Sequence, residues 1–216
     1  MSVYTYLENV IWEVAADQAG DLYEDVGGTD TCESGDGVAA WRSTSNGSIS
    51  NLSTQSTAAN RPIYQSDVGD GYPGVVFDGS NDGLIIPHAS AFNVSEITVF
   101  AVASADTISA YRFLWSRVNN GAWSNGQMLV ADSAPRVGFN AVSWDTAGPH
   151  FSPGTGTRRI YAGRYDVQSE IMICDDSIVA GRQFSTAIGT HSTNGGIGNG
   201  GAGGGNYPWD GDIHHI

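Results

Sequence analysis

The segment 73–87 and the apolar run 97–103 constrain the fold most, because short apolar stretches alternate there with a compact polar turn. Val75 and Phe77 are two residues apart, a period typical of a β-strand with one buried face. The Asp-Gly and Asn-Asp-Gly sequences that follow favour a tight turn, and the sequence predicts a hairpin here. The run 97–103 is apolar on both faces, as in a central strand. We expect these side chains to be buried: Phe77, Leu84, Ile86, Val99, Ala101, Ile171 and Ile173.

Composition favours one large β domain. The chain has 216 residues and 29 glycines, and it has no Lys, so its nine basic residues are all Arg. Good helix formers are scarce, whereas β-branched and aromatic residues are frequent. The net charge of -14 repels nucleic acid and anionic membrane surfaces. Because of this charge we expect no nucleic-acid partner. No apolar run approaches the ~18 residues of a membrane span, so we also expect no membrane insertion.

Several further motifs follow one another in the order of a known family. Besides the VVFDGSNDGLIIP segment, they are 11–17, 38–42, 60–64, 160–166, 170–179, 195–198 and 209–213. Together they resemble the laminin G-like, concanavalin A-like jelly-roll domains. The resemblance implies an all-β, antiparallel two-sheet β-sandwich over residues 10–216, after an N-terminal arm at 1–9. Because the chain stops within the last family motif, we expect a truncated or unusually short last strand that leaves an open sheet edge.

The nearest enzymes with the fold implied by this resemblance are β-glucanases with an E-x-D-x-(x)-E signature on one strand, in which the second x is optional. Such a strand places its carboxylates on one face, as nucleophile and acid/base. This chain has no such triplet and no Gly-x-Ser-x-Gly elbow. We therefore expect no catalytic activity, and a glycoside hydrolase is only the third functional hypothesis.

Loop aromatics suggest a glycan site, since a sugar ring packs on an aromatic face while nearby amides and carboxylates bind its hydroxyls. Trp12, Trp41 and Trp115 lie in apolar strand patterns and are assigned to the core. Three other tryptophans lie in loop contexts with Asn, Asp or Tyr nearby, where the alternative is that each ring fills an end of the sandwich. The predicted glycan site comprises Trp123, Asn125, Trp144, Asp145, Tyr207 and Trp209.

Acidic loops allow a structural Ca²⁺, which takes carboxylate and amide oxygens. The predicted ligands are Asp78, Asn81 and Asp82, or Asp210 and Asp212. Turn formation and solubility explain these residues equally well, and no other cofactor is expected. Cys32 and Cys174 form no metal or redox motif, and two unpaired thiols are favoured over a disulfide.

Residues 1–6 lack the basic and apolar regions of a signal peptide. A protein made in the cytoplasm with a fold used for extracellular contact suggests a decoration, spike or fibre protein on a virus particle, since phage structural proteins carry similar domains. Its partners would be a capsid or tail protein and a host-surface polysaccharide, with a homo-oligomer left open. The alternative is a carbohydrate-binding, lectin-like domain of a larger cell-surface protein.

Overall fold

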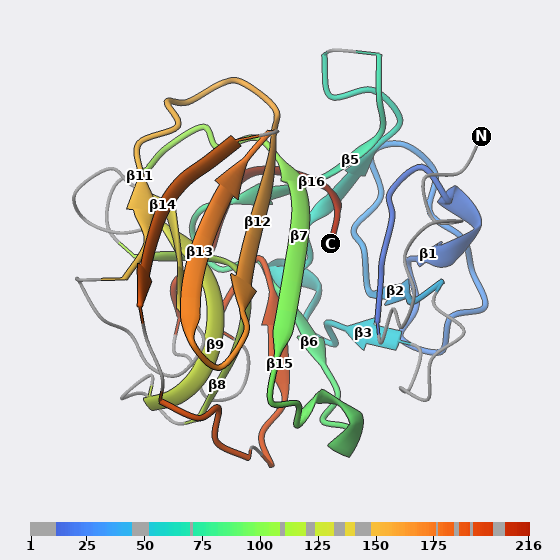
Figure 1. Cartoon of the computed structure of the whole chain (residues 1–216). Helices are drawn as coiled ribbons and strands as arrows, with labels where there is room; N and C mark the ends of the chain where they lie inside the picture. The colour runs from blue at the N-terminus through green and yellow to red at the C-terminus, as the bar shows by residue number, and fades with distance from the viewer. Residues whose placement is uncertain are drawn as a thin grey trace.

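Two antiparallel sheets of nine and seven strands form a β-sandwich (Figure 1). The computed structural model describes residues 12–44, 52–69, 71–108, 111–119, 124–131, 137–140, 148–175, 177–183, 186–190, 192–200 and 206–216. Among them are three short 3₁₀ turns: η2 (Ala19–Asp21), η3 (Ala58–Asn60) and η4 (Ser90–Phe92). The predicted fold class is therefore confirmed. No helical segment in this described part is long and apolar enough to cross a membrane.

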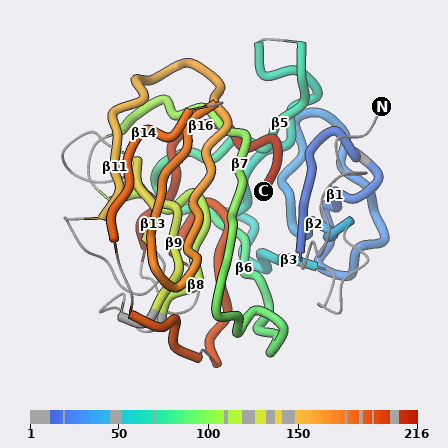
Figure 2. Tube along the Cα trace, viewed as in Figure 1, coloured from blue at the N-terminus to red at the C-terminus, as the bar shows by residue number. Residues whose placement is uncertain are grey.

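The two sheets are built from strands far apart in sequence. The nine-stranded sheet has the order β1 (Leu22–Tyr23), β2 (Ala40–Arg42), β3 (Leu52–Thr54), β6 (Leu84–Ile86), β15 (Gly195–Ile197), β8 (Arg112–Asn119), β9 (Ser124–Ala131), β10 (Val137–Asn140) and β11 (His150–Phe151). The seven-stranded sheet has the order β14 (Ser177–Gln183), β13 (Ser169–Cys174), β12 (Arg159–Tyr165), β7 (Ile97–Ala103), β16 (Asp210–His215), β5 (Gly74–Asp78) and β4 (Ile63–Gln65). In Figure 2 the trace of β1, β2 and β3 lies to one side of the long strands.

Most of the predicted core is confirmed. Five of the residues expected inside are less than a tenth exposed: Phe77, Leu84, Ile86, Val99 and Ala101. Trp41 and Trp115 are also buried, and Trp12 packs partly buried against the same cluster. Cys32 and Cys174 are buried and unpaired, as favoured from the sequence.

The predicted burial of Ile171 and Ile173 is wrong. Both are half-buried, whereas Met172 and Cys174 on the same strand are buried. Glu170 also points inward and is fully buried, because Arg182 on the neighbouring strand neutralises it. The strand therefore has the opposite orientation from the one that a charged residue at 170 suggests.

The segment 73–87 is not a hairpin. β5 pairs with β16 in one sheet, while β6 pairs with β15 in the other. The turn after Asp78, with Gly79 at φ 69°, carries the chain across the sandwich. The predicted turn at Asp78-Gly79 is present, but the two strands that it joins, β5 and β6, lie in different sheets and do not pair with each other.

Two expectations about the seven-stranded sheet are also corrected. β7 is central, but only one of its faces is buried, and Phe100 on the other is 45% exposed. The last strand leaves no open edge, because β16 lies between β7 and β5. Val14 and Ile216 exchange backbone hydrogen bonds of 2.9 and 3.1 Å, and the predicted strand 11–17 contributes a single bridge at Ala15. The predicted arm at 1–9 lies outside the described residues.

Candidate functional site

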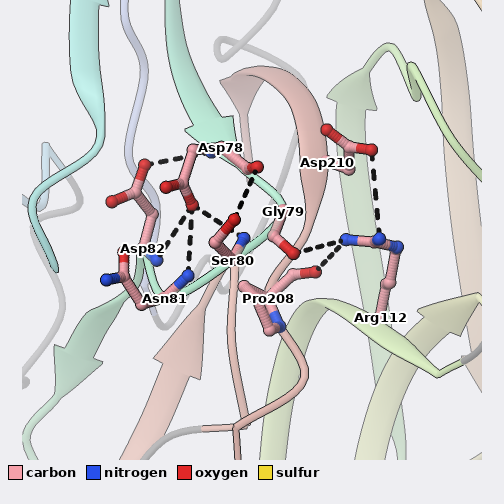
Figure 3. A network of polar contacts seen from close by, with 8 residues as sticks. All are labelled: Asp78, Gly79, Ser80, Asn81, Asp82, Arg112, Pro208 and Asp210. Atoms are coloured by element: carbon pink, nitrogen blue, oxygen red, sulfur yellow. Dashed lines mark hydrogen bonds and ion pairs between the residues drawn. The ribbon is translucent and has the colours of Figure 1, made fainter.

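The predicted calcium ligands of the 78–82 segment form a tight turn at the end of β5 (Figure 3). Asp78 Oδ1 accepts backbone N–H bonds from Ser80 at 2.8 Å and Asn81 at 3.1 Å. The backbone N–H of Asp78 in turn donates to Asp82 Oδ2 at 3.0 Å. Burial raises the pKa of Asp78, but the backbone hydrogen bonds outweigh it, so the pKa is lowered overall. Both carboxylates thus accept backbone hydrogen bonds of the local turn.

Asp82 has the more unusual electrostatic environment. Its side chain is only 5% exposed, and burial raises its pKa from 3.8 to about 6. The nearby charge of Asp78 adds to this shift, and the hydrogen bond from the Asp78 backbone opposes it. At neutral pH the turn therefore contains a buried, ionised carboxylate that the fold accommodates at a cost.

We expect Asp82→Asn to stabilise the protein at pH 8 but not at pH 4. The folded chain holds the Asp82 proton from about pH 4 up to about pH 6, so stability falls as the pH rises through this window. A shift of this size corresponds to roughly 1–3 kcal/mol. Urea unfolding at both pH values measures the difference. Asp166→Asn is the control, because hydrogen bonds from Ser169 lower the pKa of Asp166 and the change should destabilise at pH 8. An equal effect of Asp82→Asn at both pH values would contradict the assignment.

Asp210 and Asp212 lie on β16 and have other partners. Asp210 is opposite Asp78 in the strand register, yet Figure 3 shows its carboxylate directed toward Arg112, at 3.9 Å. Arg112 also donates to the carbonyls of Gly79 and Pro208, both at 3.0 Å. Among the residues that the structure describes, no group of three or more His, Cys, Asp or Glu side chains could hold a metal ion. Calcium binding by Asp, Asn and backbone oxygens stays a prediction.

Part of the predicted glycan site lies beside this turn. Tyr207 is 36% exposed, and its ring meets Tyr111 edge-on at 6.2 Å and Phe113 at 6.0 Å between ring centroids. Its backbone N–H donates to Asn199 Oδ1 at 2.9 Å, and Asn199 donates to Asn206 Oδ1 at 3.0 Å. We call these five residues the Tyr207 site.

The Tyr207 site and the Asp78 turn are joined directly. The Asn206 side chain donates to the Ser80 carbonyl at 3.4 Å, and the Asn199 side chain donates to the Asp82 carbonyl at 3.3 Å. Tyr207, from the predicted glycan set, and the 78–82 segment, from the predicted calcium set, therefore adjoin at one end of the sandwich. The result is an exposed aromatic ring next to two amide side chains that also bond backbone carbonyls of the Asp78 turn.

Trp209 does not belong to this surface, and its predicted role as a sugar platform is wrong. The side chain is fully buried in the core, and its indole N–H donates to the Ser104 carbonyl at 3.1 Å. Trp123, Trp144 and Asp145 lie outside the described residues, and Asn125 is placed only as part of β9. Their role in glycan binding stays a prediction.

The fold is shared with several solved structures. Domain 4 of AbnA, a GH43 extracellular arabinanase from Geobacillus stearothermophilus, in complex with arabinotriose, matches at 13% identity and a TM-score of 0.54, covering 95% of this chain and 89% of that one. The CBM40 of Ruminococcus gnavus IT-sialidase, bound to alpha2,3 sialyllactose, matches at 16% identity and a TM-score of 0.51, covering 66% and 86%. A Trypanosoma rangeli sialidase matches at 11% identity and a TM-score of 0.58 over 94% of this chain but 29% of its own length.

At these identities the likeness shows the fold alone. A scan against protein-family models and a search of curated proteins each find no match. The three similar structures support the β-sandwich that the sequence suggested. None of the three is a phage protein, so the suggested resemblance to phage structural proteins has no counterpart among them.

Sequence reasoning missed most of the Tyr207 site. The predicted glycan site included Tyr207 but none of its four partners, Tyr111, Phe113, Asn199 and Asn206. The local signal for Asn206 was its place directly before Tyr207. Asn199 carries no local signal, because it reaches the site through the position of β15 between β6 and β8.

Proposed function

We propose that the protein is a non-catalytic carbohydrate-binding domain that binds a neutral glycan at the Tyr207 site. The proposal rests on the exposed Tyr207 ring, which packs edge-on against Tyr111 and Phe113. The amide side chains of Asn199 and Asn206 lie beside it. Such a ring offers a face to the C–H side of a sugar, and the exposed Asn206 amide can hydrogen-bond its hydroxyls. The Asn199 amide holds the site together, since its two N–H groups and its oxygen bond within the chain. Bound arabinotriose, a neutral oligosaccharide, in one structure of the same fold supports this proposal. Bound sialyllactose in another supports carbohydrate binding but not the preference for a neutral sugar.

The preference for a neutral glycan follows from charge. The net charge of -14 repels anionic sugars. Eight of the nine arginines are described, and each already contacts a partner within the chain. Arg112 bonds two carbonyls and lies near Asp210, and Arg158 lies over the Tyr72 ring at 4.1 Å. The others are Arg42, Arg61, Arg117, Arg159, Arg164 and Arg182. This leaves little basic surface for a carboxylated or sulfated sugar.

A role on a virus particle, with a capsid or tail partner, stays a prediction. The similar structures reported above are parts of glycan-active proteins, which favours the alternative drawn from the sequence, a lectin-like domain of a larger surface protein. Extracellular or virion-surface localisation is likewise a proposal.

We expect Tyr207→Ala to weaken binding of a neutral oligosaccharide at least tenfold, about 1.4 kcal/mol, because the sugar loses its packing surface. A glycan array of neutral and sialylated oligosaccharides identifies a ligand, and titration calorimetry then measures the variant. Tyr72→Ala is the matched control, since Tyr72 is an exposed tyrosine, at 56%, that precedes β5, whereas the Asp78 turn beside the site lies at the other end of this strand. Unchanged affinity in Tyr207→Ala, or an array that shows only sialylated ligands, would overturn the proposal.

A further inference from the structure

Four strands of the seven-stranded sheet present an apolar surface away from the core. In the register, Phe100 on β7 lies opposite Ala162 on β12, and Ala162 lies opposite Ile173 on β13. Ile173 in turn lies opposite Ile178 on β14. Paired residues of neighbouring strands share a face of the sheet, so this apolar row crosses all four strands. A second pair lies beside it on β7 and β12. The outer apolar face comprises Phe100, Val102, Ile160, Ala162, Ile173 and Ile178.

The larger side chains of this face are open to solvent in the isolated chain, whereas Ala162 between them is 1% exposed. Phe100 and Ile160 are each 45% exposed, and Ile178 is 68% exposed. Figure 1 shows β14, β13, β12 and β7 as the front layer, with no described segment crossing in front of them. Exposed apolar residues scattered singly need no explanation, but a contiguous set across four strands marks an interaction surface.

The charge distribution distinguishes this face from the rest of an acidic protein. The outward positions of the four strands carry no acid, and their single charged side chain is Arg164. Arg164 pairs at 3.4 Å with Asp166 in the turn that follows β12. Asp175, at the opposite end in the β13–β14 turn, is held by Arg159 at 2.8 Å. Two copies of a chain with net charge -14 would therefore meet least repulsion face to face here.

We propose that the outer apolar face packs against the same face of a second copy of this chain. A two-fold axis brings one patch against itself, so a single self-complementary apolar surface suffices. Four strands about 4.8 Å apart and seven residues of about 3.3 Å each give a face of roughly 440 Å² per copy. Two such flat faces come to roughly 880 Å², which the relief of the side chains raises to the ~1,000 Å² at the lower limit for a specific interface. The dimer is therefore weak and depends on concentration.

Sedimentation velocity of the full chain over a wide range of concentrations tests this directly. We expect a monomer–dimer equilibrium that shifts toward dimer at higher salt, because screening reduces the repulsion between the acidic copies. Phe100→Glu places an acid within the face and should weaken the dimer at least tenfold. Circular dichroism and the melting temperature establish that the variant is folded.

Ile85→Glu is the matched control. Ile85 on β6 is 37% exposed on the other sheet, so the same class of substitution there should leave the dimer unchanged. Phe100 also separates face packing from edge pairing, because β7 lies three strands in from the edge strand β14. A chain that stays monomeric at all concentrations would overturn the proposal. So would a dimer that resists Phe100→Glu, or one that both substitutions weaken equally.

Discussion

Arg182→Met is expected to destabilise the fold by about 3–5 kcal/mol, because it leaves a buried carboxylate without its counter-charge. The Glu170 side chain is 0% exposed, and its Oε2 accepts a hydrogen bond from Arg182 Nε at 2.7 Å and forms an ion pair with Nη2 at 2.6 Å. Met has a similar length but no charge, so the packing changes little while the ion pair disappears. Urea unfolding at pH 7 measures the loss.

Two comparisons isolate the ion pair as the cause. The double variant Glu170→Leu with Arg182→Met removes both charges and should recover most of the lost stability. Arg164→Met breaks the exposed pair with Asp166, whose side chains are 53% and 30% exposed, and should cost at most ~1 kcal/mol. If Arg182→Met proves as mild as Arg164→Met, the buried pair contributes little and the interpretation is wrong.

The same ion pair explains why the orientation of β13 could not be predicted from the sequence. Ile171, Met172, Ile173 and Cys174 are all apolar, so alternation gives no preference for either face. The only local cue was Glu170, which a sequence-based argument places in solvent. Its partner comes from the next strand and becomes visible only once the register of β13 and β14 is known.

Local chemistry was predictable where neighbours in sequence determine it. The period of two around Val75 and Phe77 gave a real strand, and the Asp-Gly sequence gave a real turn. What failed was the pairing of β5 with β6, because β5 lies between β4 and β16 in one sheet while β6 belongs to the other. A turn that joins two strands of one sheet and a turn that joins two sheets use the same residue types.

The candidate site shows the same division. Tyr207 was recognised from its loop context, but the amide of Asn199 and the ring of Tyr111 reach it only through long-range strand order. Trp209, two residues further on, had the same loop context and the opposite outcome, because its indole N–H has a carbonyl partner inside the core. The sequence therefore identified the segment that forms this end of the sandwich, but it did not distinguish the exposed Tyr207 from the buried Trp209.

Trp209→Ala is accordingly expected to cost about 3–5 kcal/mol of folding stability, as for other fully buried tryptophans. Loss of the ring leaves a cavity in the main core cluster, and it leaves the Ser104 carbonyl without the indole donor. Trp209→Phe refills part of the volume but not the hydrogen bond, so we expect an intermediate loss. Chemical denaturation of both variants measures the difference.

Comparison of Trp209→Ala with Tyr207→Ala separates an effect on folding stability from an effect on glycan affinity at two positions that are two residues apart. Because Tyr207 is partly exposed and Trp209 is not, the first substitution should reduce glycan affinity with little change in unfolding free energy, and the second should do the reverse in protein that remains folded. The backbone N–H of Trp209 still bonds the Gly198 carbonyl at 2.7 Å in either variant, which keeps the start of β16 beside β15. Equal stability of the two variants would mean that the Trp209 ring is not a core residue, and its original assignment to the sugar-binding surface would then stand.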